Sequence, residues 1–196
     1  DNQIEEMAVS LLVEGILQIR TYFMIGLPTE TDDDIARLIG LVEQLANTAV
    51  KDGPRTIKFR RITVSINQFI PKPATPLQWC HLEQITEVRK KIRRIETALR
   101  KNMAVRIHVE SPRQNYLQAL FSLGDRRVGQ MLLTRHRQQG SWPHILKEAP
   151  LSPDFWVYRP KALQEILPWD FIDHGTGKAQ LVKEYRKALG LGSVTE

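Results

Sequence analysis

The apolar residues in the first part of the chain follow two spacings, one typical of helices and one typical of strands. Residues 3–15 carry apolar side chains at helical intervals, and Gly15 ends that segment with a helix C-terminal signal. The run 19–26 is continuously apolar toward its end, which is typical of a strand covered on both faces. The pattern therefore predicts a helix followed by a buried strand.

Two further helices and two further strands follow in alternation. An apolar stripe over residues 35–45 predicts a helix, whose first turn is rich in aspartate and is preceded by threonines that can act as N-caps. Residues 82–101 form the clearest amphipathic helix of the chain. Residues 62–67 and 105–109 alternate apolar and polar side chains, as strands do.

The order of these elements predicts the α/β fold class with a parallel sheet. Helices between successive strands supply the long crossovers that parallel pairing requires, and a polar loop with Asp52-Gly53-Pro54 precedes the second strand. Beyond Ser111-Pro112 the strand pattern stops. We therefore expect two domains, residues 1–110 and a helical appendage at 111–196. Helices are expected in the appendage at residues 116–123, 127–139, 162–167 and 179–189.

Composition limits the chemistry available to this chain. With 42% hydrophobic residues among 196, it can bury a core. Cys80 is the single cysteine, so the chain can form neither an internal disulfide nor an all-thiolate metal site. It has no apolar run long enough to span a membrane and no signal-peptide pattern at its start, so we expect a cytoplasmic protein. Residues 3–15 already read as a helix, so we also expect the chain to begin inside a domain.

Two strand ends have unusual sequences. In parallel α/β folds, ligands bind at the C-terminal ends of strands, where loops vary and helix N-termini point. The first strand ends in Gly26-Leu27-Pro28, where glycine permits close backbone approach and proline fixes the turn. The second strand leaves through residues 69–73, whose two prolines cannot continue a central strand. We therefore expect binding residues at both ends.

Four stretches in series resemble radical S-adenosylmethionine enzymes, of the kind often joined to a cobalamin-binding domain. They are residues 22–30, 68–79, 124–127 and 167–173, and the resemblance runs through most of the 196 residues in the right order. It implies a partial TIM barrel followed by a helical appendage, and a 4Fe–4S cluster held by a C-x3-C-x2-C motif. This chain has no such motif. It therefore resembles the C-terminal part of an iron–sulfur oxidoreductase whose cluster-binding segment lies elsewhere.

The resemblance also implies which residues line the adenosine site. A G-x-I-x-G-x-x-E pattern on a strand of that family corresponds here to Tyr22, Met24 and Gly26, with Thr29 at the acidic position and Glu30 one place late. A following strand often contacts the adenine through its backbone. The candidate cofactor-binding residues are Met24, Gly26, Leu27, Asn67, Phe69 and Ile70.

The polar positions of the second strand allow two interpretations. If the apolar set packs on the helices, then Thr63, Ser65 and Asn67 face the lumen of a barrel. They line a ligand chamber in one interpretation and a filled, hydrogen-bonded barrel interior in the other. No catalytic or metal-ligating residue is predicted within the chain.

The function implied by the resemblance belongs to a longer protein. That protein would cleave S-adenosylmethionine reductively to a 5′-deoxyadenosyl radical, with the cluster supplying the electron. This chain would supply part of the cleft, bind no cofactor alone, be inactive alone, and have the missing N-terminal part of the same protein as its partner.

An alternative function is a basic RNA- or protein-binding module without catalysis. The net charge is +6, and residues 82–101 carry many of the arginines and lysines. The Gly124-Asp125-Arg126-Arg127 stretch reads as a helix N-terminus with an ion pair, or else as a contact between appendage and barrel. Gly175-Thr176-Gly177-Lys178 lacks the full P-loop pattern, and the five histidines show no zinc spacing.

Overall fold

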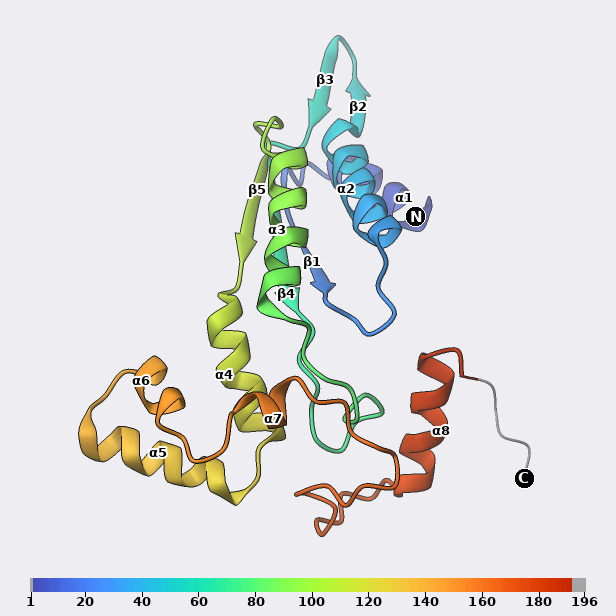
Figure 1. Ribbon diagram of the computed structural model, residues 1–196. Coiled ribbons are helices and arrows are strands. Elements are labelled where there is room, and N and C mark those ends of the chain that lie inside the picture. The colour runs from blue at the N-terminus through green and yellow to red at the C-terminus, as the bar shows by residue number, and fades with distance from the viewer. Residues whose placement is uncertain (1, 192–196) are drawn as a thin grey trace. The chain divides into compact units, whose positions relative to one another are not determined.

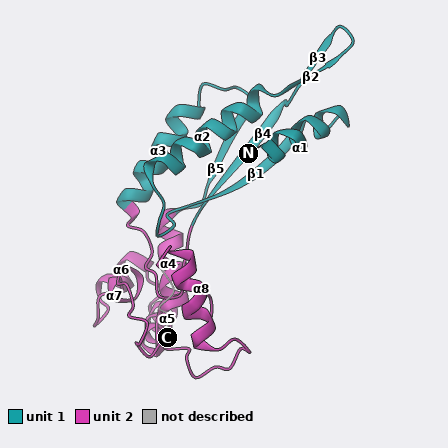
Figure 2. Ribbon diagram, turned by 90° about the vertical axis from the view of Figure 1, so that its right-hand side faces the viewer, with its two compact units in different colours: residues 1–68, 86–111 teal, residues 69–85, 112–196 magenta. Residues whose placement is uncertain are grey.

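The computed structural model describes residues 2–191 and divides the chain into two compact units (Figures 1 and 2). Unit 1 comprises residues 1–68 and 86–111, and unit 2 comprises residues 69–85 and 112–196. Each unit has hydrophobic clusters of its own.

Unit 1 contains a parallel sheet, helices and a hairpin. Its elements are α1 (Asn2–Val13), β1 (Gln18–Ile25), α2 (Asp32–Asn47), β2 (Ala49–Asp52), β3 (Arg55–Lys58), β4 (Arg61–Gln68), α3 (Ile85–Leu99) and β5 (Val105–Val109). The sheet has the order β1-β4-β5, and both strand pairs are parallel. The α/β class and the parallel sheet predicted from the sequence are therefore confirmed.

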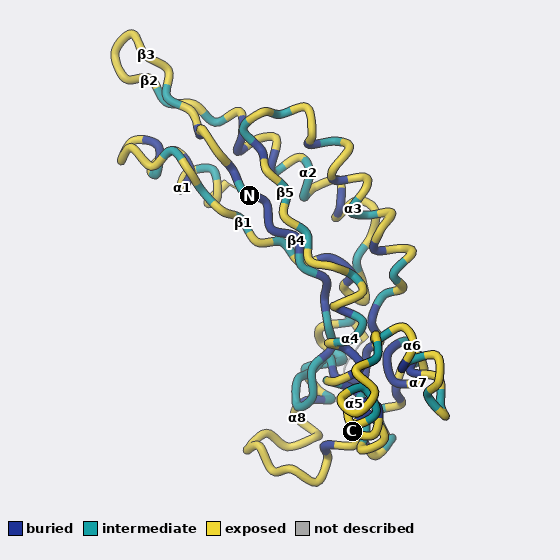
Figure 3. Tube along the Cα trace, turned by 90° about the vertical axis from the view of Figure 1, so that its left-hand side faces the viewer, coloured by how far each residue is buried: buried dark blue, intermediate teal, exposed yellow. Residues whose placement is uncertain are grey.

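The two faces of the sheet differ because its strands alternate apolar and polar residues. Ile62, Val64 and Ile66 of β4 are almost fully buried in the core of unit 1, together with side chains of α2 and α3. Figure 2 shows these two helices on one side of the strands, and the burial colours of Figure 3 mark β4 as the most buried strand. Helix α1 joins the same core through Ala8 and Leu12.

The opposite face of the sheet, which we call the open face, carries mostly polar residues. Those of β1 and β5 are exposed, whereas Thr63 and Asn67 of β4 are half-buried and Ser65 is 2% exposed. The strand register places the residues of this face in rows across the sheet: Arg20, Tyr22 and Met24 on β1; Arg61, Thr63, Ser65 and Asn67 on β4; Arg106 and His108 on β5. Tyr22 and Met24 are 68% and 53% exposed. Parallel sheets are usually covered on both faces, so this half-covered sheet is unusual.

The hairpin of β2 and β3 corrects the sequence-based interpretation of the segment with Asp52-Gly53-Pro54 as a polar loop. Val50 pairs with Ile57 and Asp52 with Arg55, around a turn in which Gly53 has φ +56°. The strands are four residues each and mostly exposed, so they give little apolar periodicity. Their formation depends on the turn and on the packing of Val50 and Ile57 against the core of unit 1.

Unit 2 consists of short helices joined by irregular segments. The helices are α4 (Pro112–Leu123), α5 (Arg126–Gln138), α6 (Trp142–Lys147), α7 (Asp154–Val157) and α8 (Lys178–Ala188). No helix forms at residues 162–167, which corrects that prediction. Pro160 and Pro168 flank this segment, and the residue before a proline is disfavoured in helical geometry.

Residues 69–85 pack in unit 2, whereas the sequence-based boundary placed them in the first domain. Trp79 and Leu82 are fully buried in the two clusters of unit 2. The Leu82 N–H donates to the Val157 carbonyl at 2.9 Å, and the Lys161 N–H donates to the Trp79 carbonyl at 3.0 Å. The chain therefore passes from unit 1 into unit 2 after Gln68, returns to unit 1 at residue 86, and enters unit 2 again after residue 111.

Within residues 2–191, no helix is both long and apolar enough to cross a membrane.

Candidate functional site

The turn after β1 is built around a glycine and a buried carboxylate. Gly26 has φ +81°, a backbone conformation that favours glycine, and its N–H donates to both oxygens of Glu30 at 3.1 and 3.0 Å. The Glu30 N–H in turn donates to the Leu27 carbonyl at 3.0 Å. These bonds fix the backbone immediately beyond the C-terminal end of β1.

Glu30 also joins this turn to helix α3. The Lys91 ammonium lies 2.6 Å from a Glu30 carboxylate oxygen, and the two side chains are only 16% and 5% exposed, respectively. A shielded ion pair of this kind is costly to break, because the remaining charge stays desolvated. Glu30 lies one position after the acidic residue of the family pattern. Its contacts make it a structural anchor of the β1 turn.

Helix α2 begins directly after this anchor with a complete capping box. Thr31 is the N-cap: its hydroxyl accepts from the Asp34 N–H, and the Asp34 carboxylate accepts from the Thr31 N–H. The side-chain hydrogen bond from Thr31 is the main cause that lowers the pKa of Asp34. The N-cap predicted from the sequence is confirmed.

A cavity of about 430 Å³ lies between the end of β1, the turn and α2. Its lining includes Met24, Leu27 and Glu30, together with apolar side chains of α2. This volume lies within the usual range of small-molecule sites, which is about 300–1,000 Å³. Two of the predicted cofactor-binding residues, Met24 and Leu27, therefore line the same cavity.

The other predicted residues lie at different places. Gly26 is buried in the turn, and Asn67 is half-buried on β4, in register with Met24 of the neighbouring strand. Phe69 and Ile70 belong to unit 2, where Ile70 packs against a hydrophobic cluster that includes Leu82. Unit 1 thus brings together Met24, Gly26, Leu27 and Asn67.

A relative exists among curated proteins. An uncharacterized protein of Methanocaldococcus jannaschii, MJ0966, is 31% identical over 118 residues, which is 60% of this chain. The matched part spans about a quarter of that relative, 24% of its length. No protein-family profile matches the chain, and no solved structure matches it.

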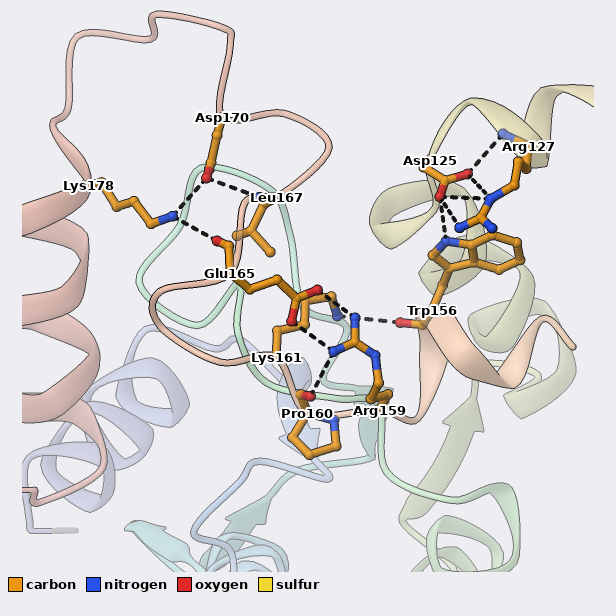
Figure 4. Close-up of polar contacts among 10 residues, drawn as sticks. All are labelled: Asp125, Arg127, Trp156, Arg159, Pro160, Lys161, Glu165, Leu167, Asp170 and Lys178. Atoms are coloured by element: carbon orange, nitrogen blue, oxygen red, sulfur yellow. Dashed lines mark hydrogen bonds and ion pairs between the residues drawn. The ribbon is translucent and has the colours of Figure 1, made fainter. Parts of the chain in front are cut away.

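Unit 2 has its own polar contacts, the first of which surrounds Asp125 (Figure 4). Asp125 is the N-cap of α5 and accepts from the Arg127 N–H at 2.9 Å. Its carboxylate also accepts from the Arg127 guanidinium and, at 3.2 Å, from the Trp156 indole. The side-chain bond from Arg127 is the main cause that lowers the pKa of Asp125 to about 2. This agrees with the interpretation of residues 124–127 as a helix N-terminus with an ion pair.

A second set of contacts surrounds a buried lysine. Lys161 is 7% exposed, and its ammonium donates to the Trp156 carbonyl at 3.4 Å. The neighbouring Arg159 and Glu165 form an ion pair of 2.6 Å, as Figure 4 shows. Burial lowers the pKa of Lys161 to about 8, and the positive charge of Arg159 acts in the same direction.

The described residues offer no ready metal site. Between residues 2 and 191, no group of three or more histidine, cysteine, aspartate or glutamate side chains is placed to hold an ion. Cys80 is buried in unit 2, and burial raises the pKa of its thiol to about 11. A thiol with so high a pKa is a poor metal ligand near neutral pH.

Proposed function

We propose that this chain is the C-terminal part of a radical S-adenosylmethionine enzyme and forms part of the wall of its S-adenosylmethionine and substrate cleft. The longer protein is called the parent enzyme below. The observation that carries the proposal is the pairing of β1 with β4, which are adjacent and parallel, with Ile25 in register with Gln68. Gly26 directly follows Ile25, and Phe69 directly follows Gln68. The two segments with unusual sequences therefore begin at the same end of the sheet, the C-terminal ends of β1 and β4.

The half-covered sheet supports the same proposal. In a partial TIM barrel, helices cover the outer face of the strands, while the inner face carries side chains that fill the lumen or bind a ligand. The helices α2 and α3 and the open face agree with such an arrangement. The proposed S-adenosylmethionine contacts in unit 1 are Met24, Gly26, Leu27 and Asn67; Phe69 and Ile70 are proposed on the resemblance alone.

The residues of this chain do not fit the iron–sulfur cluster. Such a cluster needs several thiolates, and the chain has one cysteine, which is buried and has a raised pKa. In the proposal, another segment of the parent enzyme holds the cluster, which would supply the electron for cleavage of S-adenosylmethionine. The task of this chain is to bind and orient the nucleoside and to exclude water.

The isolated chain is expected to bind no cluster and to form no 5′-deoxyadenosine. The reason is the single thiolate available to iron. Anaerobic reconstitution with iron and sulfide, followed by iron analysis and product chromatography, measures both. Stoichiometric iron with a charge-transfer band, or any 5′-deoxyadenosine, would contradict the prediction.

In the parent enzyme, Gly26→Val is expected to weaken S-adenosylmethionine binding by about tenfold or more. Valine at φ +81° is strained, and its branched side chain occupies the space that the nucleoside needs beside the backbone. Equilibrium binding measures the effect. Gly26→Ala carries similar backbone strain with a smaller side chain, and the exposed Lys51→Ala is the neutral control. Wild-type affinity in Gly26→Val would remove the adenosine-wall assignment.

The alternative RNA-binding function has weaker support because several charges on α3 are already paired. Lys90 pairs with Glu87 at 2.8 Å, Lys91 with Glu30, and Arg94 with Asp32 at 3.1 Å. These internal pairs reduce the positive charge that α3 presents to a polyanion. We therefore keep RNA binding as the second candidate, and protein binding with it.

If α3 is only a solvated surface, binding to tRNA is expected to be weak and to equal the binding of other polyanions of the same charge. Replacing Arg93 and Arg94 by glutamate should weaken all of these complexes alike. The salt dependence of the affinity is the measurement, because each phosphate contact contributes a slope of about −0.9 on duplex and about −0.7 on single strands. A tight, tRNA-selective complex that the double variant weakens would favour the RNA-binding function.

A further inference from the structure

Unit 2 contains a cavity of about 310 Å³ between the start of helix α8 and the irregular segment that precedes it. All of its lining residues belong to unit 2, and its volume is that of a small-molecule site. Phe171, Ile172 and Leu181 form one side of the lining, which we call the apolar wall. Phe171 and Ile172 are 85% and 54% exposed, so the apolar wall has surface that a ligand can cover.

Gln78 lines the same cavity, and only one end of its side-chain amide is hydrogen-bonded. The residue is 1% exposed, and its Oε1 accepts from the Trp169 indole at 2.6 Å and from the Ala74 N–H at 3.0 Å. Its NH2 group donates to no acceptor among residues 2–191, and it is not sealed from solvent as the unpaired indole nitrogen of Trp79 is. Buried amides are normally hydrogen-bonded at both ends. A free donor in a cavity wall therefore indicates a ligand group that accepts from it.

The start of α8 adds further free donors. Its N-cap is Gly177, which has no side chain that could accept from the first turn, and that turn contains no acidic residue. The N–H groups of Lys178 and Ala179 therefore have no capping partner. Gly177 has only backbone atoms, so its place in the lining puts the backbone at the helix start against the cavity. A helix start of this kind binds an anionic group such as a carboxylate.

Two aspartates in the lining disfavour a ligand that carries only negative charge. The Asp170 carboxylate is already paired with the Lys178 ammonium at 2.8 Å, as Figure 4 shows, and accepts from the Leu167 N–H at 3.0 Å. Asp173 accepts from the Gly175 N–H at 2.9 Å, and no cation within residues 2–191 pairs with it. Asp173 can therefore bind an ammonium group in the same cavity that has free donors for a carboxylate.

We propose that this cavity binds a free α-amino acid with an apolar side chain. The carboxylate accepts from the Gln78 amide and from the N–H groups at the start of α8, and the ammonium pairs with Asp173. The side chain of the ligand lies against the apolar wall. A zwitterion pairs with the free donors and with the free carboxylate together, whereas a phosphate or a simple amine pairs with only one of them. The site consists of unit 2 residues alone, so the inference goes beyond the proposed function and does not depend on it.

L-Leucine is the probe that tests all three parts of the site on the 196-residue chain. Titration followed by NMR is expected to give saturable shifts centred on residues 170–181. The analogue 4-methylpentanoate lacks the ammonium, isopentylamine lacks the carboxylate, and glycine lacks the side chain. Each is expected to bind at least about tenfold more weakly than leucine, since losing one charged hydrogen-bonding group or two buried methylenes has an effect of that size.

Three variants assign the parts of the site to residues. Asp173→Asn should remove the preference for leucine over 4-methylpentanoate, because the ammonium loses its partner. Phe171→Ser should reduce the preference for leucine over glycine. Its matched control is Ile166→Ser, since Ile166 is an 87% exposed apolar residue of unit 2 outside the lining, and this control should change nothing. Gln78→Glu keeps the acceptor oxygen but replaces the free donor by a second oxygen, and should weaken leucine binding at least about tenfold.

Gly177→Asp separates binding from folding. Gly177 has φ −66° and ψ 147°, and a Cβ at this position meets no atom within 4 Å, so aspartate fits in its usual N-cap conformation. The new carboxylate would cap α8 and occupy the donors that the ligand needs. Leucine binding is expected to fall at least about tenfold, while the midpoint of urea denaturation stays the same or rises.

Two outcomes would overturn the inference: equal binding of leucine, glycine and 4-methylpentanoate, or wild-type affinity for leucine in Gly177→Asp. An absence of saturable shifts with leucine would overturn it as well. Circular dichroism spectra identify any variant that does not fold, and Gly177→Asp keeps the test valid if Gln78→Glu unfolds.

Discussion

Replacing Glu30 by alanine is expected to lower the free energy of unfolding by about 3 kcal/mol. The substitution removes the carboxylate that faces the shielded Lys91 ammonium and that accepts the Gly26 N–H. Glu30→Gln is expected to fall between the wild type and alanine, because the amide oxygen still accepts from Gly26. Urea denaturation followed by circular dichroism measures all three proteins.

The matched control for this experiment is the exposed pair on the same helix. Glu87 and Lys90 lie 2.8 Å apart, but their side chains are largely in solvent. Glu87→Ala is expected to change the free energy of unfolding by less than about 0.5 kcal/mol, as exposed pairs generally do. Equal effects of Glu30→Ala and Glu87→Ala would show that the β1 turn does not depend on its buried ion pair.

Replacing Lys161 by methionine is expected to stabilise unit 2 by about 2–3 kcal/mol at pH 7. Burial lowers the pKa of this lysine to about 8, so the folded state holds a charge in an environment that disfavours it. Methionine has a similar length and no charge. Urea denaturation at pH 7 measures the change, with the exposed Lys147→Met as control.

The stabilisation by Lys161→Met should depend on pH in a defined direction. Below pH 8 the lysine is protonated in both folded and unfolded states, and its burial cost is fully present. Between about pH 8 and its ordinary value of 10.5, the unfolded chain binds more protons, so the wild type gains stability as pH rises. The advantage of the variant should therefore shrink at pH 9.5, and a constant or growing advantage would contradict this account.

Hydrophobic periodicity predicted the elements of unit 1 that bury an apolar face. β4 and α3 were found within a few residues of their bounds, because their apolar positions repeat at intervals of two or about 3.6. The β2–β3 hairpin has no such face and was not predicted. The helix expected at 162–167 has suitable spacing, but the prolines on either side leave it too short.

The sequence predicted the backbone turn of the candidate site but not the long-range contacts that hold it. Gly26 followed by Pro28 signals a special turn in the sequence itself. The pairing of Glu30 with Lys91 joins residues 61 positions apart, and no local pattern reports it. The same holds for residues 69–85, whose burial in unit 2 depends on partners that lie much later in the chain.

Strand β1 has one further consequence for handling the protein. Within the described residues it pairs only with β4, so the N–H and C=O groups along its outer edge, eight residues long, are left without a neighbouring strand. A long edge of this kind is a template on which another chain can add. Concentrated solutions of this chain are therefore prone to edge-to-edge aggregation.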